Sequence, residues 1–304
     1  ALTIRRLRGK LDGAPVDIGW REMFAAKAPY RQRYDLKGTV PAALMAKAGM
    51  PSPEPYISGP VGVTVRYQTL ANGTGDVTAK LDLKGATASV PPLGWTKPAA
   101  TDGTVDFSAK LAQGGKLASA DFDGRGGGLT AKGQVRFGAD NVVQQITLKQ
   151  IAIGRSDLAI DWVRGTAGME FSARGPALEW SQVRDALRWR DEKVSAEGSA
   201  ATSTPRERTV INLQLDQLLV ERGTLGSISG RMELTGDRIA SAEMQLSGGK
   251  GAAFRVTPSK PGEPSVRSIG IYVPDFGQFL RTAGWLDGFT GSFFDFQGRR
   301  SEEH

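Results

Sequence analysis

The 304-residue chain contains no cysteine and a single histidine, His304, at its last position after "RRSEE". Without cysteine there is no disulfide framework and no thiolate metal site. One terminal histidine gives no basis for a Ser-His-Asp triad or a His-based zinc site. The missing cysteine fits the bacterial periplasm, and it fits a cytosolic protein as well.

The sequence also lacks long hydrophobic runs. No stretch approaches the roughly 18 apolar residues that a membrane-spanning helix requires, and no basic start followed by an apolar segment marks a signal peptide. The chain opens at Ala1 rather than Met. We therefore interpret it as a piece of a longer protein, with any membrane anchor outside it.

The charge is mildly basic, with a formal net charge of +7 and a pI near 9.7. Arginine and lysine are scattered along the chain, which is typical of a soluble surface. Attraction to anionic lipid headgroups is the alternative, at about 1 kcal/mol per basic residue near such a surface. Nucleic acid is not an expected partner, because the basic residues are not interleaved with the exposed aromatic residues that base stacking needs.

Alternation of apolar and polar residues with a period of two dominates what is present. In 61–67, Val61, Val63 and Val65 alternate with smaller or polar residues, and 77–83 repeats the pattern after the turn "ANGTG". Such a pair predicts a β-hairpin. More than a dozen segments of this kind, joined by short glycine-rich turns, predict antiparallel meanders.

Three segments break the alternation with helical spacing, and we expect short helices near 41–49, 177–190 and 274–286. An open twisted sheet rarely exceeds about ten strands without curling or splitting. The many small residues on the apolar face favour a curved sheet with space inside. We predict two β segments, 1–174 and 175–304, in one continuous sheet.

Motifs that would carry chemistry are weak. "AQGGKLAS" and "LSGGKGAA" are turns with a lysine rather than phosphate-binding loops. "DFDGRGGG" at 121–128 lacks the later acidic ligand of an EF-hand, and Glu179 with Asp185 is best interpreted as part of a solvated helix face. We expect no catalytic residues, no metal, no cofactor and no enzymatic activity.

Three stretches resemble the AsmA-like superfamily of bacterial envelope proteins, most closely its YhdP-type domains. They are "YDLKGTVPAALMAKAGMPSPEPYISGPVGVTVRY" (34–67), "LDLKGATASVPPLGWTKPA" (81–99) and "VPDFGQFLRTAGWLDGFTGSFFDFQGR" (273–299). The first carries a strand, a short helix and a "YISGP" turn. The other two carry the "P-P-L" and "D-x-G-x-x-L-x-x-x-G" patterns. Together they cover about a quarter of the chain.

The resemblance implies a mostly β fold in which a long curved antiparallel sheet forms a taco-like apolar groove, capped or interrupted by a few short helices. It implies conduction or binding of phospholipid between the inner and outer membranes, with the protein in the periplasm and tethered to the inner membrane by a helix outside this chain. Other envelope proteins are further expected partners. The bare transfer of a two-chain lipid through water would cost roughly 20–25 kcal/mol at about 0.8 kcal/mol per methylene, so an apolar trough needs no catalytic group.

The lipid-facing candidates are the large apolar residues of the alternating strands. They are Val105, Phe107, Leu111, Val135, Phe137, Ile146, Leu148, Leu158, Ile160, Trp162, Met169, Phe171, Leu213, Leu215, Met232, Leu234, Met244 and Leu246. Leu93, Trp95, Phe279 and Trp285 are expected at the edge or mouth of the groove.

Two alternatives remain open. The same apolar residues can form an ordinary protein core, and the chain can be a non-enzymatic structural or assembly module of the envelope that binds proteins through its sheet edges. The segment "PPLGW" (91–95) is expected to form an apolar corner against the groove, with its prolines blocking edge pairing. Leu93 and Trp95 are then expected to be buried.

Overall fold

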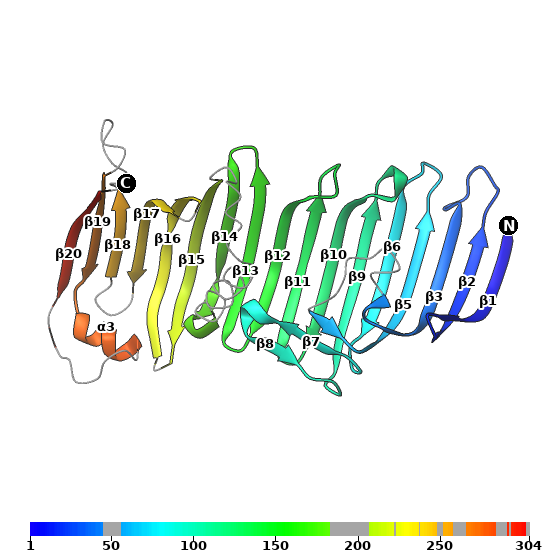
Figure 1. Cartoon of the computed structure of the whole chain (residues 1–304), viewed down its shortest axis with the longest axis horizontal. Helices are drawn as coiled ribbons and strands as arrows, with labels where there is room; N and C mark the ends of the chain where they lie inside the picture. The colour runs from blue at the N-terminus through cyan, green and yellow to red at the C-terminus, as the bar shows by residue number, and fades with distance from the viewer. Residues whose placement is uncertain are drawn as a thin grey trace. The chain divides into compact units, whose positions relative to one another are not determined.

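The computed structural model describes residues 1–44, 56–182, 207–221, 223–236, 238–247, 252–257, 266–283, 291 and 293–301 (Figure 1). The described residues are mostly strand, and 17 of the strands belong to one large, mostly antiparallel sheet. The prediction of a mostly β, antiparallel protein is confirmed. A taco-like groove is not shown.

The chain divides into two compact units, Ala1–Ile153 (unit 1) and Gly154–His304 (unit 2). Unit 1 is a meander in which each main strand is antiparallel to the next. Its main strands are β1 (Leu2–Leu11), β2 (Ala14–Glu22), β3 (Gln32–Pro41), β5 (Pro60–Thr69), β6 (Gly75–Asp82), β9 (Gly103–Leu111), β10 (Leu117–Gly126), β11 (Leu129–Phe137) and β12 (Val143–Ile153). A separate three-stranded sheet contains β4 (Ile57–Ser58), β7 (Thr87–Val90) and β8 (Trp95–Lys97).

Unit 2 continues the same plan with one exception. Its elements are β13 (Ser156–Gly165), β14 (Gly168–Glu179), β15 (Arg208–Val220), β16 (Gly223–Thr235), β17 (Arg238–Ser247), β18 (Ala252–Thr257), β19 (Val266–Val273), α3 (Phe276–Ala283) and β20 (Phe294–Ser301). β14 and β15 run parallel, whereas the other described pairs are antiparallel. The segment boundary expected after residue 174 falls inside β14.

The expected helices are described only in part. Residues 45–55 lie outside the described residues, and with them most of the helix expected at 41–49. In the second segment, 177–179 belong to strand β14, 180–182 are helical, and 183–190 lie outside the described residues. The third helix is confirmed as α3, and 284–286 lie outside the described residues.

The register of unit 1 aligns its apolar residues into ladders that cross the strands. One ladder runs Ile18, Leu36, Val65, Ala79, Phe107, Phe122, Gly133 and Leu148, with each residue directly opposite the next. We call the side that carries this ladder the apolar face of unit 1. Because side chains alternate across a strand, the residues between these positions form a polar face on the other side.

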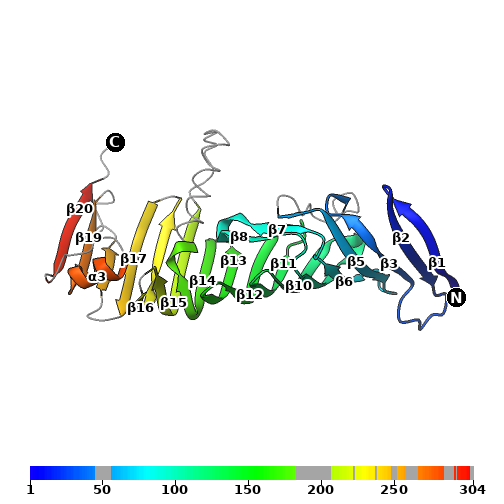
Figure 2. The ribbon, with the colours of Figure 1, turned by 90° about the horizontal axis from the view of Figure 1, so that it is seen from below.

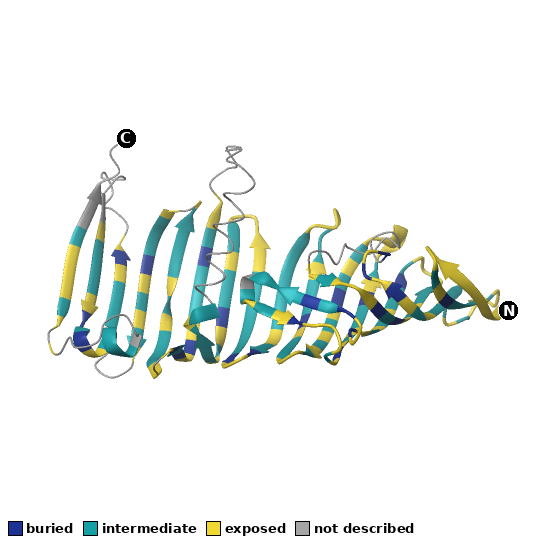
Figure 3. Cartoon of the chain, turned by 60° about the horizontal axis from the view of Figure 1, so that its bottom comes forward, coloured by how far each residue is buried: buried dark blue, intermediate teal, exposed yellow. Residues whose placement is uncertain are grey.

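Burial along these ladders is incomplete. The residues of this ladder are half-buried rather than buried, apart from Gly133, and Figure 3 shows intermediate burial along most strands. Among the described residues, a compact cluster of buried side chains forms at one end of the apolar face, around Val16, Val40, Val61 and Leu83. There, residues 41–44, Ile57 and the segment from Leu83 to Ala86 cover the sheet. In the described structure, the rest of the ladder has no such cover.

Figure 2 shows β7 and β8 of the small sheet beside the strands of the large sheet, and Lys97 of β8 anchors the small sheet in unit 1. Lys97 is 1% exposed, and its Nζ donates hydrogen bonds to the carbonyl oxygens of Ala86, Pro98 and Thr101 at 2.8, 3.0 and 2.9 Å. Its aliphatic stem lies against Gly103 and Gly127, where an added Cβ would lie 3.0 Å from the lysine.

Candidate functional site

A large hollow of unit 1 lies over the polar face. It has a volume of about 1070 Å³. Two rows of polar side chains flank it, and the backbone of the ladder from Ile18 to Gly133 lies between these rows. One row contains Asp17, Lys37, Thr64, Lys80, Asp106, Asp123 and Lys132, and the other contains Asp35, Arg66, Thr78, Ser108 and Asp121.

Ion pairs neutralise much of this charged surface. Asp35 accepts hydrogen bonds from Arg33 and Arg66, both at 2.8 Å. Partial burial favours the neutral carboxyl of Asp35, but the two guanidinium partners outweigh it and hold its pKa below the usual value. A hydrogen bond from Lys110, at 2.7 Å, lowers the pKa of Asp76 in the same way. The polar hollow therefore has the character of a solvated, internally paired surface.

Unit 2 contains an apolar hollow of a different character. Its volume is about 260 Å³, and its wall is almost entirely apolar. β17 contributes Met244 and Leu246, β18 and β19 contribute Phe254 and Ile271, and α3 contributes Phe279. Trp180 follows directly after β14 and also lines it. None of the described residues that line this hollow has an ionisable side chain.

Strand register places these side chains together. Leu246 lies opposite Ile228, Met244 lies opposite Phe254, and Phe254 lies opposite Ile271. Because directly paired residues share one face of a sheet, the alternation that predicted the strands also collects these side chains on one side. A register shift between Leu215 and Leu218 changes the phase of β15, and Leu218 and Val220 enter the lining as a result.

Helix α3 covers one part of this hollow and packs on β16. Asp275 initiates the helix, because its carboxylate accepts a hydrogen bond from the Gln278 backbone N–H at 2.9 Å. Such a side-chain cap satisfies one of the first N–H groups of a helix. The cap fixes the start of the helix and so the position of Phe279.

Polar contacts fix the chain around Trp180. Ser156 is buried; its hydroxyl contacts the Gln182 side-chain oxygen at 2.7 Å and accepts a hydrogen bond from the Glu179 backbone N–H at 2.9 Å. Arg155 pairs with Glu179 at 2.9 Å, and this hydrogen bond lowers the pKa of the Glu179 carboxyl. These contacts fix the chain at Glu179 and Gln182, on either side of Trp180.

Most of the sequence-predicted lipid candidates share the apolar sides of the two units. Val105, Phe107, Leu111, Val135, Phe137, Ile146 and Leu148 lie on the apolar face of unit 1, and all are half-buried. In unit 2, Leu158, Ile160, Trp162, Met169, Phe171, Leu213, Met232 and Leu234 are half-buried, and Leu215 is buried.

Only three of the predicted residues line the apolar hollow: Met244, Leu246 and Phe279. Leu93 and Trp95 are half-buried in the small sheet and its turn, and Trp285 lies outside the described residues. Phe254, Ile271 and Leu218 also line the hollow, although the sequence pattern did not predict them at this site. The alternation of Phe254 and Val256 predicts strand β18, whereas no feature of the sequence predicts the register shift in β15.

A scan against protein-family models, a search of curated proteins and a search of solved structures each found no match. No group of three or more potential metal-ligating side chains occurs among the described residues. Within the same residues, no helix combines the length and the apolar character needed to span a bilayer.

Proposed function

We propose that the chain is a non-enzymatic lipid-binding segment whose apolar sides hold the acyl chains of phospholipid. The observation that carries the proposal is the apolar hollow of unit 2, whose described lining includes Met244, Leu246, Phe254 and Phe279 and no ionisable side chain. The half-buried ladder of unit 1 supports it. Monomeric soluble proteins rarely leave large contiguous apolar surface uncovered, so such surface marks a site of interaction.

The size of the hollow suits one acyl segment. A methylene has about the size of a water molecule, which occupies about 30 Å³, so 260 Å³ accommodates roughly nine methylenes. At about 0.8 kcal/mol per buried methylene, the gross transfer free energy is about 7 kcal/mol. The charged headgroup does not enter such an apolar site and remains in water.

In this proposal the apolar side of each unit is a path along which phospholipid moves between the inner and outer membranes. The resemblance of 34–67, 81–99 and 273–299 to the AsmA-like superfamily supports the periplasm as the location and a tether to the inner membrane outside this chain. The energetic reason is independent of the resemblance. A continuous apolar path lowers the barrier to transfer without any catalytic group.

Adjacent residues on opposite faces of β16 provide the test. Ile228→Glu places a carboxylate in the apolar hollow, and Ser229→Glu places the same group on the polar side of the same strand. Native mass spectrometry of the chain incubated with phospholipid vesicles should show bound lipid for the parent and for Ser229→Glu. Ile228→Glu should retain less than about a tenth of it, because an ionised carboxylate is costly to bury.

Circular dichroism checks that both variants keep their β content. Equal lipid occupancy in the two variants contradicts the proposal, and so does a parent chain that binds no phospholipid.

A further inference from the structure

The first strand of unit 1 is exposed along its whole length. All ten residues of β1 are exposed, and β1 pairs with β2 alone within the described structure. Its outer edge therefore presents backbone N–H and C=O groups to solvent. Such an edge is a template for a further strand.

The two faces of β1 differ in chemistry. Leu7 lies opposite Ile18, so it extends the apolar ladder of unit 1 by one strand. Leu2, Ile4, Leu7 and Leu11 are 41–55% exposed. The other side of the strand is basic, with Arg8 opposite Asp17 and Lys10 opposite Pro15.

The positive charge of β1 exceeds what its neighbour neutralises. Arg6 pairs with Asp17 at 2.5 Å and Arg8 lies 3.8 Å from the same carboxylate, so one acidic group serves two arginines. No ion pair or hydrogen bond of the Arg5 or Lys10 side chain is found within the described residues. A strand added to this edge meets a basic row on one face and an apolar row on the other.

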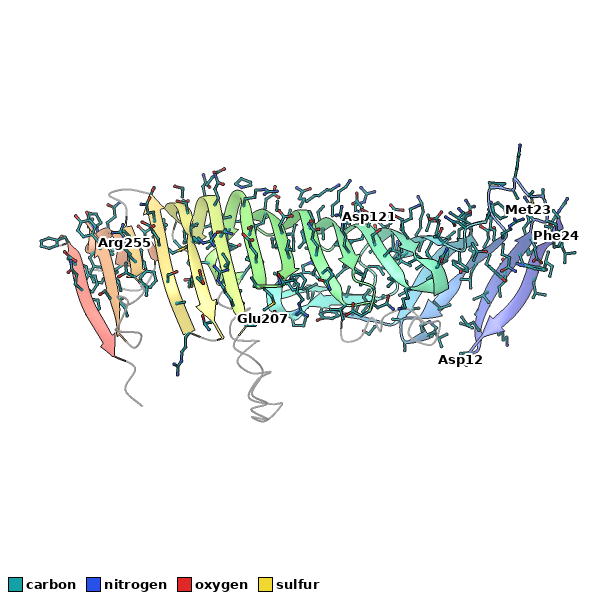
Figure 4. All side chains as sticks on the ribbon, turned by 90° about the horizontal axis from the view of Figure 1, so that it is seen from above. Asp12, Met23, Phe24, Asp121, Glu207 and Arg255 are labelled. Carbon is teal, nitrogen blue, oxygen red and sulfur yellow. The ribbon has the colours of Figure 1, made fainter. Side chains whose placement is uncertain are left out.

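The end of β2 adds a second apolar contact. Phe24 follows β2 and is 66% exposed, and Figure 4 shows it with Met23 at the end of the β1–β2 hairpin opposite to Asp12. Leu2 lies opposite Glu22, so Phe24 lies at the same end of the edge as Leu2. A strand on β1 that begins or ends with a large apolar residue finds an aromatic side chain there.

We propose that the outer edge of β1 binds a further β-strand in which acidic and apolar residues alternate. Its apolar residues continue the row of Ile4 and Leu7, and its carboxylates face Arg5, Arg8 and Lys10. This partner strand is independent of the lipid proposal, because it occupies an edge rather than an apolar face.

Charge complementarity favours an acidic strand over a second copy of the chain as the occupant of this edge. The last strand, β20, has the sequence "FDFQGRRS", with one acidic residue and two arginines. Pairing β20 of one copy with β1 of another would bring arginine to an edge that is already basic. Hydrogen bonding favours a strand over lipid as the occupant of this edge. A strand pairs with the outward N–H and C=O groups of β1, whereas the interior of a bilayer offers them no partner.

The test uses the full chain and two fluorescent peptides of ten residues, the length of β1. One alternates valine with glutamate and the other alternates valine with lysine, since valine favours strands. Fluorescence anisotropy should show saturable binding of the glutamate peptide and none of the lysine peptide. Amide hydrogen exchange in β1 should slow at least about tenfold on saturation, because a strand partner protects the outward N–H groups.

Paired variants locate the contact. Arg5→Glu with Lys10→Glu should weaken binding of the glutamate peptide roughly tenfold, since each exposed charge pair contributes modestly. Lys149→Glu, an exposed residue of β12, is the matched control and should leave binding unchanged.

Four results overturn the proposal. The first is equal binding of the two peptides, and the second is peptide binding without slower amide exchange in β1. The third is exchange in β1 that is slowed by anionic phospholipid vesicles and not by the peptide. The fourth is exchange in β1 that slows as the concentration of the chain alone is raised. The last two results identify a membrane surface or a second copy as the occupant.

Discussion

The ammonium group of Lys97 lies 2.8 Å from the carbonyl oxygen of Ala86, two residues that the sequence separates by a turn and two short strands. Lys97 contacts two further carbonyl oxygens, and no carboxylate of the described residues pairs with it. It therefore satisfies three backbone acceptors at once and joins the small sheet to the loop before β9.

Replacing Lys97 with methionine tests this role. Methionine keeps most of the aliphatic stem against Gly103 and Gly127 but leaves the three carbonyl oxygens without their donor. An unsatisfied buried acceptor costs about 1–3 kcal/mol, so we expect the free energy of unfolding to fall by about 2–4 kcal/mol. Urea unfolding followed by tryptophan fluorescence measures it.

Lys132→Met is the control, because Lys132 is exposed and its ion pair in the described part of the chain is the surface pair with Asp123. Its effect should stay below about 0.5 kcal/mol. A loss of equal size in both variants contradicts the role assigned to Lys97.

A close approach between two strands depends on Gly133. A Cβ at this position would lie 2.6 Å from the carbonyl oxygen of Thr147 and 3.1 Å from the ring of Phe122. Phe122 lies directly opposite Gly133 and covers it. Gly133→Ala should therefore destabilise unit 1 by about 1–3 kcal/mol through crowding, the usual cost of overpacking.

Gly270→Ala is the contrasting variant in unit 2, since nothing lies within 4 Å of a Cβ at that position. Thermal unfolding should show a lower Tm for Gly133→Ala and little change for Gly270→Ala. The reverse order would show that the crowding at Gly133 relaxes without cost.

The paired carboxylates predict the pH dependence of stability. Hydrogen bonds lower the pKa of Asp17 (from Arg6), Asp76 (from Lys110) and Glu233 (from Arg208) below the values of the unfolded chain. A lowered pKa in the folded state contributes stability that is present above the unfolded pKa of about 4 and is lost as the pH falls through the folded pKa.

The urea midpoint should thus be nearly constant from about pH 7 to pH 5 and fall as the pH drops below about 4. Asp35→Asn should reduce the size of this fall, because Asp35 holds two arginines in the native state. Because solvent screens these partly exposed charges, the Asp35 ion pairs contribute less than about 1 kcal/mol to the free energy of unfolding at pH 7. A midpoint that rises on acidification contradicts the assignment.

Alternation in the sequence predicted local pairing well. The expected hairpin of 61–67 and 77–83 is confirmed as β5 and β6, with Val63 opposite Leu81 and Tyr67 opposite Val77. Such contacts follow from the two-residue period and a short turn. The parallel pair β14–β15 was not predicted, because local periodicity carries no information on strand direction across a long connection.

The direction in which the sheet is hollowed is a long-range property, and sequence alternation does not determine it. Phe107 and Asp106 are adjacent residues on opposite faces. The alternation predicts that their side chains lie on opposite faces, but it does not predict which face is concave. In unit 1 the large hollow lies over the side of Asp106. The burial of Lys97 was also missed, since its partners are backbone carbonyls and glycines that no side-chain pattern marks.

The apolar face of unit 1 gives the last prediction. Leu148 lies on that face, half-buried and opposite Gly133, whereas Thr147 lies on the other side and opposite Gln134. Leu148→Glu should reduce the binding of a fluorescent phospholipid to the chain at least about fivefold, because acyl chains would have to pack against an ionised carboxylate. Thr147→Glu adds the same charge to the same strand and should bind lipid as the parent does. If both variants bind equally, acyl chains do not lie on this part of the apolar face, and the hollow of unit 2 would be the lipid site by itself.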